Sequence, residues 1–187
     1  MNVSKEYTQE DYLVAQLSRL GVGYLSRLGT AEPPKRTNPA GLLAELVHQP
    51  TSRVRVAVIS LFLAHPDYSE YVPAALKSLP GKHAQTLKIF YTAAFLLQKQ
   101  YARSLKPFLG VKWEWLPDLF SQELGLVPLS IKEALIKLAQ IHTELTKIEL
   151  NWAGTYDNAA SHLLRRWQME QNGRCSIFTQ PESDRMG

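Results

Sequence analysis

Basic side chains spaced along one predicted helix are the residues of this chain best suited to binding an anion. At 100° per residue, Lys88, Lys99 and Lys106 fall within about 20° of one another along a helix expected over about residues 82–105. Arg103 lies about 60° away on the same helix, and Arg53 opens an earlier helix. Because lysine and arginine neutralise phosphates, these five residues predict a face that binds nucleic acid or another polyanion.

Aromatic residues accompany these charges in the sequence. Phe95 falls among the lysines, Tyr91 lies on the same helix, and Trp113 and Trp115 alternate just after it. An exposed ring can stack on a nucleic-acid base, and two exposed tryptophans mark an interface. The alternative is that the lysines are the solvated face of an amphipathic helix and the tryptophans anchor a loop to the core.

No other reactive residues form a catalytic or metal-binding pattern. The five histidines, at positions 48, 65, 83, 142 and 162, lack the spacing of HExxH and similar ligand sets. His142 borders an apolar stripe and is expected to be a partly buried histidine with satisfied hydrogen bonds. A single Cys175 excludes an internal disulfide and a cysteine-based zinc site. The sequence therefore predicts no catalytic residue, no metal and no cofactor.

The charge is distributed unevenly along the chain. Residues 51–112 hold nine basic and two acidic side chains, a net charge of +7, whereas residues 113–187 hold seven basic and ten acidic side chains. Such a basic middle favours an anionic partner. It is also compatible with a fold in which the two parts complement each other.

Composition indicates one globular domain. The chain has 187 residues, 45% of them hydrophobic and 20% charged, which suits a single core that needs no disulfides. No apolar run approaches the roughly 20 residues of a membrane span. The N-terminal residues carry acids where a signal peptide needs an apolar segment. These features predict a cytoplasmic protein with no membrane partner.

The hydrophobic pattern predicts an all-α fold of six to eight helices. Helices are expected over residues 9–28, from Pro39, over 53–64 and 82–105, after Ser130, and over 156–170, with a short one near 117–124. Residues 53–64 are apolar on most of their circumference, which indicates a helix buried on both sides. The helical domain should span 1–170, followed by a polar, mobile tail over 171–187. The core should include Leu61, Phe62, Phe90, Leu97, Leu138 and Leu145.

Residues 41–80 resemble HEAT-like helical repeats. The resemblance lies in the succession LLAEL, a turn with Pro50, SRVRVAV, LAHPD and YVPAAL. It implies helical hairpins in which Pro50 forms the turn and Arg55 braces it. The helix over 82–105 is too long for the pattern, and no clean repeat follows residue 107. A compact bundle with one embedded hairpin fits equally well.

These observations favour a non-enzymatic interaction module that binds a macromolecular partner, either a protein or a polyanion. The alternative is a helical enzyme or regulator acting on nucleic acid, such as a HEAT-like DNA-repair enzyme or a component of a toxin–antitoxin pair. No catalytic residue of such an enzyme can be assigned in this sequence. The oligomeric state is not predicted.

Overall fold

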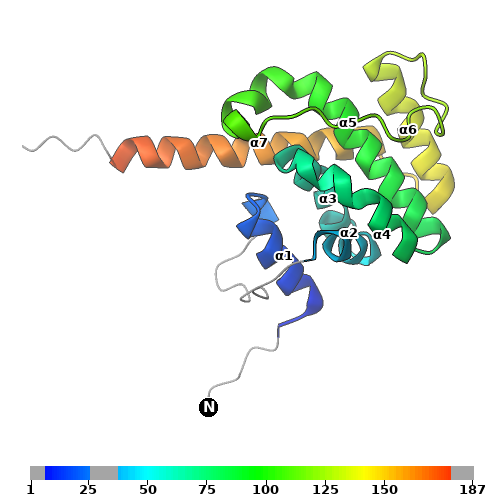
Figure 1. Ribbon diagram of the computed structural model, residues 1–187, viewed down its shortest axis with the longest axis horizontal. Helices are drawn as coiled ribbons and strands as arrows, with labels where there is room; N and C mark the ends of the chain where they lie inside the picture. Colours follow the sequence, from blue (N-terminus) through cyan, green and yellow to red (C-terminus); the bar gives the residue numbers. More distant parts are fainter. Residues whose placement is uncertain (1–6, 26–37, 178–187) are drawn as a thin grey trace, which may run out of the picture.

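The computed structural model describes residues 7–25 and 38–177, with side chains described as far as residue 173. Within these residues the chain forms seven α-helices and no strand, which confirms the predicted all-α fold (Figure 1). The helices are α1 (Gln9–Arg19), α2 (Pro39–His48), α3 (Ser52–Ala64), α4 (Val72–Ser78), α5 (Gly81–Leu109), α6 (Ile131–Thr146) and α7 (Trp152–Ile177). Three 3₁₀ turns are η1 (Gly23–Leu25), η2 (Pro66–Tyr71) and η3 (Gly110–Lys112).

Local sequence signals set several helix starts. Thr8 and Asp11 form a reciprocal capping box at α1, and Ser130 and Glu133 form another at α6. Each box satisfies backbone N–H groups that the first turn leaves unpaired. The side chain of Asn38 accepts a hydrogen bond from the Ala40 N–H at the start of α2.

Helix α3 is the centre of the fold. It packs against α2, α5 and α7, and every residue from Val56 to Ala64 is buried. Burial on all sides is what its apolar circumference predicts. Leu61, Phe62, Phe90, Leu97 and Leu138 are buried as expected, whereas Leu145 is only partly buried.

The first helix is shorter than the sequence predicts. Helix α1 ends at Arg19, and Gly21 adopts a φ of +82° that favours glycine. The turn is closed by a hydrogen bond of 2.9 Å from the Val22 N–H to the Leu17 carbonyl, and η1 follows. Residues 26–28 of the expected helix lie outside the described residues.

Polar contacts from several elements attach α1 and η1 to the rest of the fold. The Thr51 hydroxyl donates to Glu10 at 2.6 Å, and the Trp167 indole N–H donates to the Gly21 carbonyl at 2.9 Å. His65 Nε2 lies 2.8 Å from the Leu20 carbonyl oxygen. His65 therefore connects the end of α3 to the end of α1.

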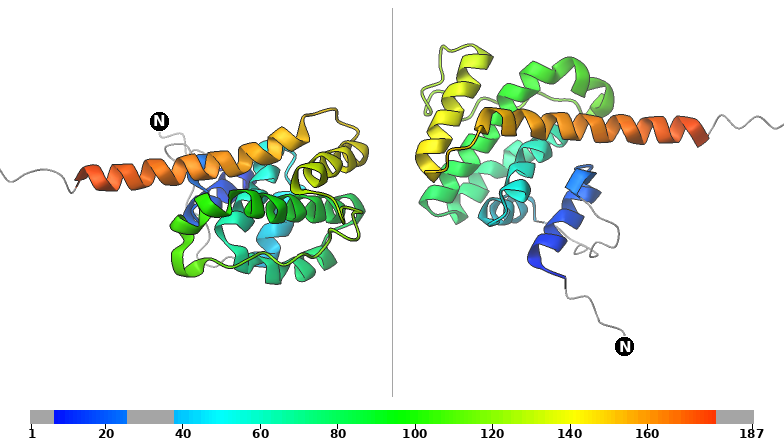
Figure 2. Two further views of the ribbon diagram at one scale, coloured as in Figure 1. Left: turned by 90° about the horizontal axis from the view of Figure 1, so that it is seen from above. Right: turned by 180° about the vertical axis from the view of Figure 1, so that it is seen from behind.

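Two further segments differ from expectation. Residues 117–124 form turns instead of a short helix, and α7 continues through Ile177 instead of ending near residue 170. The ion pair between Arg166 and Glu170, one helical turn apart, supports the extension, and no proline interrupts it. The end of α7 projects beyond the other helices (Figures 1 and 2). Residues 171–177 of the tail predicted over 171–187 therefore belong to α7, and residues 178–187 lie outside the described residues.

A membrane-spanning helix is not found among the residues that the structure describes.

Candidate binding surface

The segment that follows α5 runs back along that helix (Figure 1). Its first part, residues 110–117, is called the tryptophan loop here because it carries Trp113 and Trp115. It begins where α5 ends, at Gly110, which has a φ of +52°. The loop is extended after η3 and makes its hydrogen bonds to side chains of α5.

Gln98, which is fully buried on α5, holds the tryptophan loop in place. Its amide nitrogen donates to the Glu114 carbonyl at 2.9 Å, and its amide oxygen accepts from the Leu116 N–H at 2.8 Å. One side chain thus satisfies backbone groups on both sides of Trp115. The Tyr91 hydroxyl donates to the Pro117 carbonyl at 2.7 Å and fixes the end of the loop.

The loop presents its tryptophans next to a lysine. The ring centroids of Trp113 and Trp115 lie 5.1 Å apart in an edge-to-face arrangement. Lys106 Nζ lies 5.3 Å from the first centroid and 5.1 Å from the second. Trp113 is partly buried, whereas Trp115 is 53% exposed. The structure therefore combines one positive charge with an accessible indole.

Three of the predicted basic residues form a continuous row on α5. Lys99, Arg103 and Lys106 follow one another at spacings of four and three residues, which places them on one helix face. All three are exposed, and none forms an ion pair within the part of the chain that the structure describes. This row is called the cationic stripe. Its like charges repel one another, and a bound anion would reduce this repulsion.

The prediction that Phe95 and Tyr91 are exposed stacking rings is wrong. Phe95 is 6% exposed, and Lys99 Nζ lies 4.2 Å from its ring centroid. Tyr91 is fully buried, and burial, with the charge of Asp118, raises the pKa of its hydroxyl. Both rings belong to the core, so Trp115 is the exposed aromatic residue of this surface.

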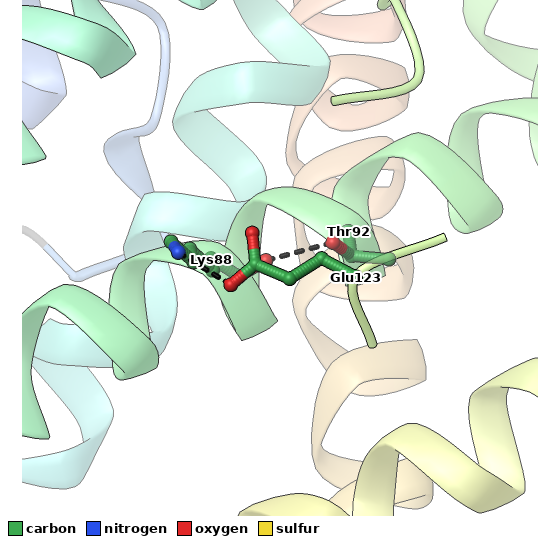
Figure 3. A network of polar contacts seen from close by, with 3 residues as sticks. All are labelled: Lys88, Thr92 and Glu123. Carbon is green, nitrogen blue, oxygen red and sulfur yellow. Dashed lines mark hydrogen bonds and ion pairs between the residues drawn. The ribbon is translucent and has the colours of Figure 1, made fainter. Parts of the chain in front are cut away.

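Lys88 does not extend the cationic stripe. Its ammonium pairs with Glu123 at 2.5 Å, and its side chain is only 20% exposed (Figure 3). Figure 3 also shows Thr92 one turn later, whose hydroxyl donates to the Lys88 carbonyl at 2.8 Å. The charge of Lys88 is therefore neutralised within the fold.

Arg53 lies at a different place from the other predicted basic residues. It lines a cavity of about 220 Å³ with residues of η1, α3, α7 and the segment before α7, and none from α5. The five predicted basic residues therefore do not form one surface. The cationic stripe and the tryptophan loop, in contrast, lie next to each other.

A second cavity of about 220 Å³ lies beside the stripe. Lys99, Phe95, Asp118 and Ser121 are among its lining residues. The backbone N–H of Ser121 donates to Asp118 at 3.0 Å, but its buried hydroxyl has no hydrogen-bond partner. Among the described residues this is the only buried side-chain polar atom without a partner.

Ser121→Ala should therefore leave the free energy of unfolding unchanged or raise it by up to about 1 kcal/mol, because it removes a desolvated hydroxyl without breaking a bond. Urea denaturation of both proteins checks this. A loss above about 1 kcal/mol would show that the hydroxyl has a partner in solution.

The described residues give no indication of a metal centre. No group of three or more His, Cys, Asp and Glu side chains among them is arranged to hold a metal ion. His142 is fully buried instead of partly buried as expected, with its ring stacked on Trp152 at a centroid distance of 3.7 Å.

Gln98 is the important residue of this surface that sequence reasoning missed. The available signal was a polar amide at the end of the apolar run from Ala93 to Leu97. Such a residue must find hydrogen-bond partners when buried, but its partners follow 16 and 18 residues later.

Comparisons with protein-family models, with curated proteins and with solved structures found no match for this chain.

Proposed function

We propose that this protein is a non-enzymatic interaction module that binds single-stranded nucleic acid through the cationic stripe and Trp115. The observation that carries the proposal is the position of Lys106 beside an exposed indole that the fold holds in place. Proteins that bind single strands without reading sequence combine a positive track for phosphates with aromatic side chains on which bases stack. The stripe extends for about 10 Å along α5.

Unpaired charge also supports this proposal. Lys99, Arg103 and Lys106 have no carboxylate within ion-pair distance among the described residues, so a phosphate chain does not have to displace an internal partner. Neutralising phosphates releases counterions, which makes the affinity depend steeply on salt.

The test is a fluorescence-anisotropy titration of labelled single-stranded and double-stranded DNA and RNA at about 50 and 200 mM salt. Single strands should bind more tightly than duplexes, and affinity should fall with salt. Trp115→Ala should weaken binding by about 1–3 kcal/mol. Lys106→Gln should lower the slope of log affinity against log salt by about 0.7.

Lys77→Gln is the matched control, because it removes one charge from an exposed lysine on α4. It should leave the salt slope unchanged. Absence of binding at low salt would refute the proposal, as would equal binding by the parent and a triple variant without the stripe's charges.

A protein partner is the second candidate function, and exposed apolar residues favour it. The chain between α5 and α6 carries several large apolar side chains that are at least one-third exposed: Val111, Trp115, Leu119, Val127 and Leu129. Exposed tryptophan and arginine are typical of the residues that dominate protein interfaces. Under this alternative, Trp115→Ala would abolish capture of a partner co-purified from the native host, while no oligonucleotide would bind.

A further inference from the structure

A second cationic site lies at the opposite end of α5. There a cavity of about 230 Å³ is lined by residues of α2, α3, α5 and α6 and by Ile148. Four of its nine lining residues carry a basic nitrogen and none carries a carboxylate; the four are Arg55, Lys82, His83 and His142.

Arg55 brings an unpaired charge into this cavity. One of its guanidinium N–H groups donates to the Gln49 carbonyl at 3.1 Å, which braces the turn between α2 and α3. The side chain is partly buried, burial lowers its pKa, and no carboxylate lies within ion-pair distance among the described residues. Guanidinium has five N–H donors in a planar fork, so most of them remain available to an anion.

His142 supplies a buried imidazole. The residue is 1% exposed, and among the described residues the one hydrogen bond of its ring joins Nδ1 to the Tyr156 hydroxyl at 2.8 Å. Burial raises the pKa of Tyr156, so its hydroxyl keeps its proton, and within the described residues Nδ1 is that hydroxyl's only acceptor. A hydroxyl that donates to Nδ1 leaves the imidazole proton on Nε2.

His142 is one of the residues that line the cavity. Nε2 makes no hydrogen bond within the residues that the structure describes. An N–H donor on a residue that lines a carboxylate-free cavity is suited to an anionic oxygen.

The start of α5 completes the site. Lys82 and His83 line the cavity from its first turn, and the His83 ring stacks on that of His48 with centroids 4.1 Å apart. Burial lowers the pKa of His83, and the charges of His48 and Arg55 lower it further. The positive charge of Arg55 therefore acts on this side of the cavity, and a bound anion would offset it.

From this arrangement we propose that the cavity binds a phosphate group, either free or esterified to a small molecule. Arg55 and Lys82 match the two negative charges of a phosphate, and His142 and His83 offer further N–H donors. The forked guanidinium suits phosphate geometry, and basic residues from three helices line the cavity. The site is independent of nucleic-acid binding, because its residues lie at the end of α5 remote from the cationic stripe.

The test is isothermal titration calorimetry of the full chain at pH 7 and low chloride, with inorganic phosphate, glycerol phosphate and acetate as separate ligands. Phosphate should bind saturably with a Kd below about 10 mM. Lys82→Gln and Arg55→Gln should each weaken binding by about tenfold or more. Lys77→Gln, which removes one charge from an exposed lysine on α4 outside the cavity, is the matched control and should bind phosphate as the parent does.

The three ligands distinguish a site for esterified phosphate, a site for free phosphate and a site for anions in general. Tighter binding of glycerol phosphate than of phosphate would indicate an esterified ligand, and equal binding would indicate free phosphate. Acetate that binds as tightly as phosphate would refute the assignment to phosphate. Absence of saturable phosphate binding would refute the site, as would equal losses in Lys82→Gln and Lys77→Gln. Lys82 is exposed at the start of α5, so its variant remains testable even if Arg55→Gln does not fold.

Discussion

Replacing Gln98 by leucine should lower the free energy of unfolding by about 2–4 kcal/mol. Leucine fills a similar volume but offers no polar atom, so the buried Leu116 N–H and the Glu114 carbonyl lose their partner. A buried backbone group left unpaired costs about 1–3 kcal/mol. The change should also release Trp115, so binding through the tryptophan loop should weaken along with stability. Urea denaturation and the oligonucleotide titration measure the two effects.

Gln100→Leu is the control for this prediction. Gln100 is an exposed glutamine on the same helix, and its amide makes one long contact of 3.3 Å to Asp157. Its replacement should cost less than about 1 kcal/mol. If the two variants lose similar stability, the bridge from Gln98 to the tryptophan loop is not what holds the loop.

Acidification should destabilise the fold by about 2 kcal/mol between pH 7.5 and pH 5 through His142 alone. Burial and then the charge of Arg55 lower the pKa of this histidine to about 4, whereas an unfolded histidine has a pKa of about 6.5. Between these values the unfolded chain binds a proton that the folded chain does not. The contribution of His142 to the free energy of unfolding is therefore fully present above about pH 6.5 and is lost as the pH falls towards 4.

Denaturation curves at several pH values test this prediction. His142→Gln removes the titrating group, so its stability should depend less on pH than that of the parent by about 2 kcal/mol over this interval. His83, whose pKa is also lowered, adds a loss in the same direction. His83→Gln, the matched control, should therefore keep the His142 contribution. An unchanged pH dependence in His142→Gln would contradict the assignment.

The helices were predictable because their signals are local. A capping box at Ser130 and Glu133, an Asn-Pro helix start and an apolar circumference over 53–64 each act within a few residues of sequence. The all-α fold and most of the named core follow from such signals. The predicted lengths of α1 and α7 were less accurate. Gly21 ends α1 early, whereas nothing before residue 178 interrupts α7.

The binding surface was predictable only in part, because its charges and rings depend on distant residues. Lys88 is on the expected face of α5, but its partner Glu123 lies 35 residues later in a segment without helical periodicity. The same segment covers Tyr91, whose hydroxyl bonds to Pro117. Periodicity places residues on a helix face, but it does not show which part of that face a later segment will cover.

The rigidity of the tryptophan loop has a consequence for the thermodynamics of association. Folding already fixes the backbone on both sides of Trp115, through the two hydrogen bonds of Gln98 and the one from Tyr91. The indole itself packs edge-to-face against Trp113, so a partner meets a side chain that folding has already placed. Ordering a flexible side chain on binding costs about 0.5–1.5 kcal/mol, and a preorganised one avoids much of that entropy loss. The preorganised indole should show its advantage mainly as a slower dissociation rate, since affinity differences between related complexes arise mostly there.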